Sequence, residues 1–134
     1  MNTTEASRAL MARYFGDLKD GDLGRHLTED VTWTNEETGQ LLQGRTAVTA
    51  FVRTLHVQMG ELTTRTYIVE DDAAMIEGDC LPVVAGAMPA DRLPYVLVYD
   101  LTPDGIVAIR LYMSITRLPL GTQSRDARPA APPT

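Results

Sequence analysis

The hydrophobic spacing of this sequence changes near Met59, from the period of amphipathic helices to the alternation of β-strands. The apolar residues of segment 5–18 recur every three or four positions, which predicts an amphipathic helix with one buried face. The same spacing returns over residues 46–59, and residues 23–28 predict a short helix between the two. A chain that forms helices before strands favours an α+β domain, with the helices packed on one face of a curved sheet.

The strand segments predict a mainly antiparallel sheet. Residues 31–35 are rich in β-branched and aromatic side chains, as expected of a first strand. The sequence Thr102-Pro103-Asp104-Gly105 is a strong hairpin turn signal and pairs the last two strands. Two polar or Gly- and Pro-containing segments, 36–43 and 85–92, predict loops or a loose hairpin. The later strands are predicted over residues 62–70, 73–84, 93–101 and 106–118.

Length and terminal composition favour a single domain. The 134 residues are enough for one hydrophobic core, which we place in residues 1–120. Residues 121–134 are rich in Pro and Ala, so we expect a disordered tail there. The first residues carry neither the basic region nor the apolar stretch of a signal peptide, and we expect a cytoplasmic protein.

Charge and composition exclude several classes of function. The 18 acidic and 12 basic residues give a net charge of −6, and the basic residues are scattered singly. Nucleic acids and anionic membrane surfaces bind basic patches, so we expect neither as a partner. The single cysteine cannot form an internal disulfide, and the two histidines have no cysteine partner for a zinc site. The sequence contains no Gly-rich phosphate loop, so we expect neither a metal nor a nucleotide cofactor.

Several short motifs occur in the order typical of one superfamily. From the N-terminus they are Arg13-Tyr14, Gly21-Asp22-Leu23, Glu29-Asp30-Val31-Thr32-Trp33, Gly44-Arg45-Thr46-Ala47-Val48, Tyr99-Asp100-Leu101 and Arg110-Leu111-Tyr112-Met113. In this order and spacing the chain resembles the nuclear-transport-factor-like proteins, which include ketosteroid isomerases, SnoaL-like polyketide cyclases and limonene-type epoxide hydrolases. The resemblance covers about residues 5–118 and implies a cone-shaped fold. The concave face of such a sheet is a natural small-molecule pocket.

The resemblance implies roles for a few residues. Tyr14 matches the tyrosine with which ketosteroid isomerases donate a hydrogen bond to an enolate oxygen. Asn35 stands where those enzymes have an aspartate as general base, and Leu97 stands where they have a second acidic donor. Trp33 and Asn35 resemble the aromatic residue and asparagine that hold the nucleophilic water in epoxide hydrolases. The catalytic aspartate of those hydrolases falls near Leu111, so neither chemistry is matched in full.

Four residues are candidates for catalysis: Tyr14, Asn35, Glu77 and Asp79. Tyr14 either donates to a substrate oxygen or is a core tyrosine with one partner. Asn35 either holds a water or a substrate oxygen, or caps a turn. The isomerase resemblance places Glu77 and Asp79 in the concave pocket, where desolvation raises the pKa of a carboxyl group. With the opposite strand parity, both carboxylates lie on the solvated outer face of the sheet.

The predicted wall of the pocket is apolar and aromatic. Its substrate-binding residues are Trp33, Phe51, Leu55, His56, Met59, Tyr95, Leu97, Tyr99, Leu111 and Met113. His56 flanks the apolar stripe of its helix, where a histidine is more often a boundary residue than a catalyst. On the opposite sheet face, Val96 and Val98 contribute to an apolar strip, which predicts a homodimer through the sheet.

Together these features predict a cofactor-independent isomerase or cyclase that uses acid–base chemistry. Its substrate is expected to be a hydrophobic oxygenated small molecule, such as a polyketide- or steroid-like compound. An epoxide hydrolase or an epoxide-opening cyclase is the nearest alternative. A binding domain without catalysis is the other alternative, because the aspartates of the isomerases are absent from this sequence.

Overall fold

The computed structural model describes residues 3–82 and 92–113. The helices are α1 (Thr4–Asp20), η1 (Leu23–His26) and α2 (Arg45–Met59). The strands are β1 (Leu27–Asn35), β2 (Leu41–Gln43), β3 (Glu61–Val69), β4 (Ala73–Leu81), β5 (Leu93–Thr102) and β6 (Gly105–Tyr112). The tail predicted at 121–134 lies outside the described residues, as do residues 85–91 of a predicted loop and 114–118 of the last predicted strand.

Local sequence signals explain the boundaries of the N-terminal helices. The hydroxyl of Thr3 accepts a hydrogen bond from the amide of Ala6 and caps the start of α1. Gly21 ends α1 in the left-handed conformation, with φ of 82°, which glycine adopts without strain. The short helix predicted over 23–28 is a 3₁₀ helix of four residues, because Leu27 is already extended and begins β1.

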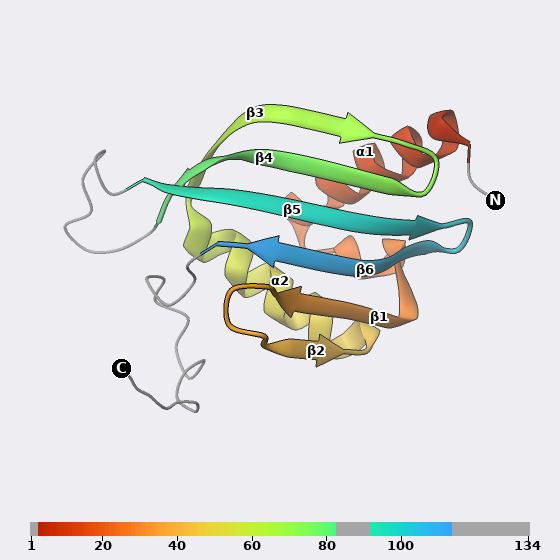
Figure 1. Ribbon diagram of the computed structural model, residues 1–134. Coiled ribbons are helices and arrows are strands. Elements are labelled where there is room, and N and C mark those ends of the chain that lie inside the picture. The colour runs from red at the N-terminus through yellow and green to blue at the C-terminus, as the bar shows by residue number, and fades with distance from the viewer. Residues whose placement is uncertain (1–2, 83–91, 114–134) are drawn as a thin grey trace.

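The six strands form one sheet in the order β2-β1-β6-β5-β4-β3 (Figure 1). β1 and β6 pair in parallel, and the four other pairs are antiparallel. As predicted, a hairpin joins β5 to β6, with Thr102 paired to Gly105. The predicted α+β architecture is therefore confirmed. The short strand β2 falls in the segment predicted as a loop or loose hairpin, and it adds an edge to the sheet.

A β-bulge and a glycine shape the far edge of the sheet. The register between β3 and β4 shifts between Thr64 and Thr66, which makes Arg65 the extra residue. A Cβ atom on Gly78 of β4 would lie 1.8 Å from the carbonyl oxygen of Thr63, so only glycine fits at this crossing. A bulge bends its strand and increases the local twist, and this edge of the sheet curves in Figure 1.

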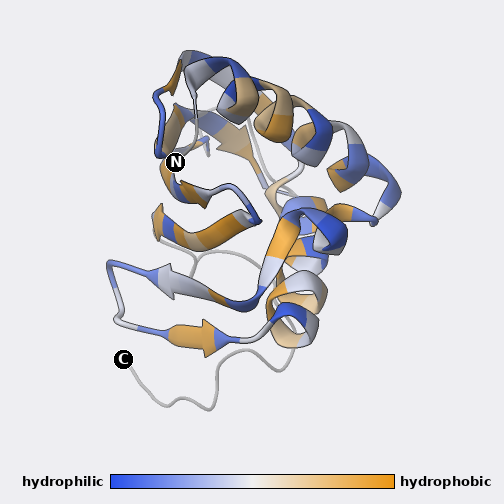
Figure 2. Cartoon of the chain, turned by 90° about the vertical axis from the view of Figure 1, so that its right-hand side faces the viewer, coloured by the Kyte–Doolittle hydropathy of each residue, from blue (hydrophilic) through white to orange (hydrophobic). Residues whose placement is uncertain are grey.

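Both α-helices lie on one face of the sheet, seen from the front in Figure 1 and from the side in Figure 2. α1 contacts β3 and β4, whereas α2 contacts β1 and β2, so the helices cover opposite parts of the sheet. The buried core between the layers includes Met11, Leu23, Val31, Val48 and Ile106. Within the described ranges, none of the helices combines the length and apolar character of a membrane span.

Candidate functional site

A cavity of about 260 Å³ lies between the helices and the middle of the sheet. Both α-helices and five of the strands contribute side chains to its wall, which is mainly apolar. Half of the lining residues were expected there from the sequence: Tyr14, Trp33, Leu55, His56, Met59, Tyr95, Leu97 and Tyr99. The concave face therefore encloses a space suited to a small apolar molecule.

Aromatic side chains of the cavity wall carry polar atoms that are themselves buried. The rings of Tyr14 on α1 and Tyr99 on β5 pack edge to face, with centroids 5.7 Å apart. Trp33 and Tyr95 are 0% and 2% exposed. Among the described residues, neither the Trp33 Nε1 nor the Tyr95 hydroxyl has a hydrogen-bond partner. A buried polar group without a partner costs roughly 1–3 kcal/mol, so a ligand oxygen that reaches these donors would be stabilised.

The hydroxyls of Tyr14 and Tyr99 keep their protons. Burial raises the pKa of Tyr14 and of Tyr99 well above the usual value of 10.0, and nearby Tyr14 and Tyr95 add to the rise at Tyr99. A neutral phenol donates a hydrogen bond to a carbonyl or enolate oxygen. These hydroxyls can therefore polarise a substrate oxygen, but they cannot act as general bases near neutral pH.

His56 is the lining group suited to accept a proton. It lies on α2 and is half-buried, and the exposed Lys19 at the end of α1 also lines the cavity. Desolvation lowers the pKa of His56 below its usual value of 6.5, and the positive charge of Lys19 lowers it further. The imidazole is therefore neutral at pH 7, the form in which histidine acts as a general base.

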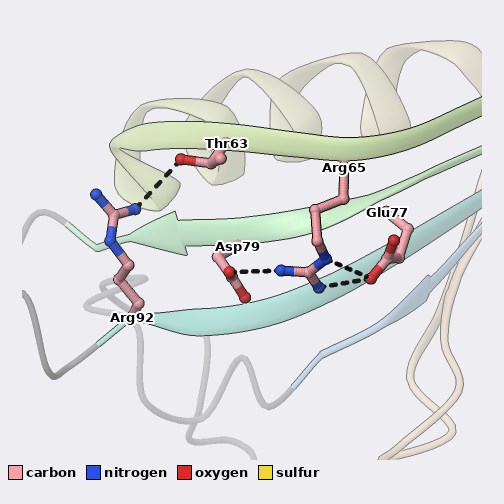
Figure 3. A network of polar contacts seen from close by, with 5 residues as sticks. All are labelled: Thr63, Arg65, Glu77, Asp79 and Arg92. Carbon is pink, nitrogen blue, oxygen red and sulfur yellow. Dashed lines mark hydrogen bonds and ion pairs between the residues drawn. The ribbon is translucent and has the colours of Figure 1, made fainter.

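Glu77 and Asp79 lie on the outer face of the sheet, so their predicted place in the pocket is wrong. Both carboxylates bind the guanidinium of Arg65 (Figure 3). Its Nη2 lies 2.5 Å from Glu77 Oε2, and its Nη1 lies 2.7 Å from Asp79 Oδ2. Hydrogen bonds from Arg65, and then from Thr66, hold the pKa of Glu77 below its usual range. A carboxylate outside the cavity with a lowered pKa is not placed to move a substrate proton near neutrality.

The parity of β4 accounts for this correction. Ile76 lines the cavity, and Ala74, Gly78 and Cys80 on the same side of the strand are buried. The isomerase resemblance predicted the opposite parity, and a shift of one residue exchanges the two faces of a strand. A signal for the correct parity was present in the sequence, because the carboxylates alternate with the small or apolar residues that an inner face accepts.

Asn35 is buried on the same strand face as Trp33, but it closes a turn and is not a lining residue of the cavity. Its Oδ1 accepts hydrogen bonds from the amides of Glu37 and Thr38 at 2.8 and 2.9 Å. Its Nδ2 donates to the carbonyl oxygen of Met113 at 3.3 Å. The turn-capping alternative is therefore correct, and the predicted catalytic placement of Asn35 is wrong because its amide is already bonded.

Three residues predicted for the pocket wall lie beside the cavity instead. Phe51 packs its ring on that of Trp33, with centroids 4.4 Å apart, and supports the wall from behind. Leu111 and Met113 are buried in the core, where the sulfur of Met113 lies 3.8 Å from the sulfur of Cys80. These three residues do not line the cavity, so they affect its shape only through packing.

Sequence reasoning missed the other half of the cavity wall: Phe15, Leu18, Lys19, Val52, Leu62, Thr64, Ile76 and Ile109. Helical spacing carries a signal for two of them, because a step of four residues leads from Tyr14 to Leu18 and from Phe15 to Lys19. Thr64 precedes the β3 bulge, whose register shift no spacing rule in the sequence reveals.

Comparison with known proteins identifies the family of the domain. Residues 5–109 match the family model of the SnoaL-like domain. Among curated proteins, none matches this sequence.

Solved structures with the same fold come from several bacterial proteins. An NTF2-like protein from Mesorhizobium loti superposes with a TM-score of 0.69 at 19% identity, over 83% of this chain and 93% of that one. The epoxide hydrolase/cyclase-like enzyme SalBIII, which has a role in pyran ring formation in salinomycin, superposes with a TM-score of 0.67 at 17% identity. The match covers 88% of this chain and 98% of SalBIII. A candidate ketosteroid isomerase from Kribbella flavida superposes with a TM-score of 0.65 at 19% identity, over 97% of this chain and 87% of that one. At these identities, the similarity shows the fold.

Proposed function

This chain belongs to the SnoaL-like domain family, and from that membership we propose that its cavity is an active site. In this proposal the cavity binds a hydrophobic oxygenated small molecule, such as a polyketide- or steroid-like compound. The protein then isomerises or cyclises this molecule by cofactor-independent proton transfer.

The pair of unsatisfied donors in the cavity supports this proposal most directly. Trp33 Nε1 and the Tyr95 hydroxyl are buried among apolar side chains without a hydrogen-bond partner in the described structure. In a core that bound no ligand, these two donors would lower the stability of the fold without any compensating hydrogen bond, and buried polar groups are normally bonded. A carbonyl or hydroxyl oxygen of a bound molecule supplies the missing acceptor.

Two further lining residues supply the chemistry. The neutral His56 imidazole takes a proton from the carbon beside a substrate carbonyl, and the electron pair of that C–H bond forms an enolate. The protonated Tyr14 hydroxyl donates to the enolate oxygen as negative charge develops on it. Return of the proton to another carbon completes an isomerisation, whereas attack of the enolate on a second carbonyl closes a ring and leaves an alkoxide, which takes the proton from His56.

Exchange of carbon-bound protons tests the proposal without knowledge of the natural substrate. The ketone 2-tetralone carries acidic α-protons, and NMR follows their replacement by deuterium in D₂O. We expect the protein to accelerate this exchange. His56→Gln should slow the catalysed exchange by about 10²-fold or more, and Tyr14→Phe by about 10²- to 10³-fold.

Glu77→Gln is the matched control for these variants. It removes an ionisable group from the outer face, where Arg65 binds it, and should leave the exchange rate within about twofold of the parent rate. Exchange by His56→Gln at the parent rate would contradict the role of the imidazole.

A ligand-binding domain without catalysis is the second candidate. It is favoured by the absence of any carboxylate from the cavity wall in the described part of the chain. In that case 2-tetralone would raise the melting temperature of the protein, but no variant or parent would accelerate deuterium exchange. The epoxide-opening alternative has less support, because the amide of Asn35 is bonded within its turn.

A further inference from the structure

Lys19 is the only lysine of the sequence, and it stands at the cavity. It belongs to the last turn of α1, where its side chain is exposed while part of it lines the cavity wall. Long cationic side chains commonly lay their apolar stem along a surface and keep the charged end in water. In the described part of the chain, no ion pair includes Lys19, so its ammonium group is available to a ligand.

Among the described residues, the cavity wall carries one permanent charge, which is the positive charge of Lys19. Half-buried His56 of α2 also lines the cavity. An ammonium group donates hydrogen bonds and cannot accept them. An acceptor group of a ligand beside Lys19 is therefore stabilised, and an anionic acceptor gains Coulombic attraction as well.

Two buried donors in residues of the cavity wall lack an acceptor. Trp33 Nε1 is a donor only, and it lies, like the Tyr95 hydroxyl, without a partner in the described structure. The rest of the wall is mainly apolar, with Leu55 and Ile109 among its residues. The complementary molecule thus has an apolar body with an oxygen acceptor at each end.

We propose that the cavity takes a hydrophobic carboxylic acid, with its carboxylate beside Lys19 and a carbonyl oxygen toward Trp33 and Tyr95, so that His56 remains free to act on the carbon beside that carbonyl. This assignment rests on the proposed function and specifies the class of its substrate. A carboxylate matches the single permanent charge of the wall. A phosphate dianion would keep an excess negative charge, because no arginine lines the cavity in the described part of the chain.

Calorimetric titration with two matched probes tests this assignment. The first probe is 6-acetyl-2-naphthoic acid, which carries a ketone and a carboxylate at opposite ends of a flat apolar body. The second is its primary amide, which has nearly the same shape and no charge. We expect the acid to bind about fivefold more tightly at low ionic strength, the gain typical of a partly exposed ion pair. The preference should shrink at high salt, since salt screens exposed charges.

Lys19→Met keeps the apolar stem and removes the charge. The ratio of the two affinities should fall from about five to about one in this variant, with the affinity for the amide within twofold of the parent value. Arg13→Met is the matched control, because Arg13 is exposed on the same helix and does not line the cavity. It should leave the preference for the acid intact. A role of Lys19 confined to the C-terminus of α1 would lower stability but leave the ratio unchanged.

The possible results separate this inference from the proposed function. Equal binding of acid and amide by the parent protein overturns the carboxylate assignment and leaves a site for neutral oxygenated molecules. Retention of the preference in Lys19→Met also overturns it. If neither probe binds, the inference fails together with the oxygenated-ligand site on which it rests.

Discussion

The ionisation of His56 can be followed at the scale of a single residue. Because its folded-state pKa lies below the usual 6.5, the unfolded chain binds a proton before the folded chain does. The free energy of unfolding should therefore fall as the pH is lowered through 6.5 toward the folded-state pKa. Above pH 6.5 the imidazole is neutral in both states, so the ionisation of His56 costs no stability there. Urea titrations at pH 7.5 and 5.5 measure the loss. His56→Gln should lose less stability over the same interval, and an equal loss would contradict the shift.

The same ionisation predicts the pH dependence of catalysis. Only the neutral imidazole accepts a proton, so the deuterium exchange of 2-tetralone should be constant above pH 6.5 and decline below it. The midpoint of the decline should lie under 6.5, since burial and Lys19 both disfavour the charged form. A rate that rises as the pH falls would instead point to an acid as the rate-determining group.

The hydrogen bonds of Asn35 predict a role in stability. Its side chain satisfies the amides of Glu37 and Thr38 and the carbonyl of Met113, so Asn35→Ala leaves one buried and two partly buried polar groups without these partners. We expect a loss of about 2–3 kcal/mol in the free energy of unfolding, measured by urea denaturation. The rate of 2-tetralone exchange by the folded variant should remain close to that of the parent. A variant as stable as the parent would show that the turn does not need the amide.

At the scale of the elements, the crossing of β3 and β4 depends on one glycine. Gly78→Ala would bring its Cβ within 1.8 Å of the backbone oxygen of Thr63, so the two strands must separate or shift. A destabilisation of about 1–3 kcal/mol is expected, as for other overpacked sites. Gly16→Ala is the control, because Gly16 lies in α1 with nothing within 4 Å of an added Cβ. That variant should gain about 1 kcal/mol from helix propensity.

The elements were largely predictable because they follow from local spacing. The stripe of apolar residues defined α1 and α2, and the turn at Pro103-Asp104 defined the last hairpin. Site residues carried by helices, such as Tyr14 and Leu55, were placed correctly for the same reason. The face of β4 was not predictable from spacing alone, since alternation gives two faces and leaves open which one is inner. The bulge and the hydrogen bond from Asn35 to Met113 depend on contacts between distant segments.

At the scale of the whole molecule, the outer face of the sheet predicts self-association. Leu41, Ile68 and Tyr112 are 58%, 46% and 46% exposed, and strand pairing places them on the face opposite the helices. We expect a twofold homodimer through this face. Sedimentation at tens of micromolar should give about 29 kDa, twice the chain mass of 14.7 kDa.

A charged substitution on this face tests the dimer interface without disrupting the fold. Tyr112→Arg should shift the protein to a monomer while it stays folded, because burial of an unpaired charge opposes association. Val57→Arg is the control, because Val57 is 64% exposed on α2, which covers the other face of the sheet. A parent protein that sediments as a 14.7 kDa monomer would rule out the dimer.

The parallel pairing of β1 with β6 has a consequence for biosynthesis. Trp33 pairs with Ile109, so this wall of the cavity unites segments 76 residues apart, and chain entropy opposes contacts of such long range. During synthesis β1 leaves the ribosome before β6, so Trp33 cannot be enclosed until β6 has been synthesised and has paired with β1. A small molecule that binds this cavity is therefore expected to stabilise the chain only after β6 has docked beside β1.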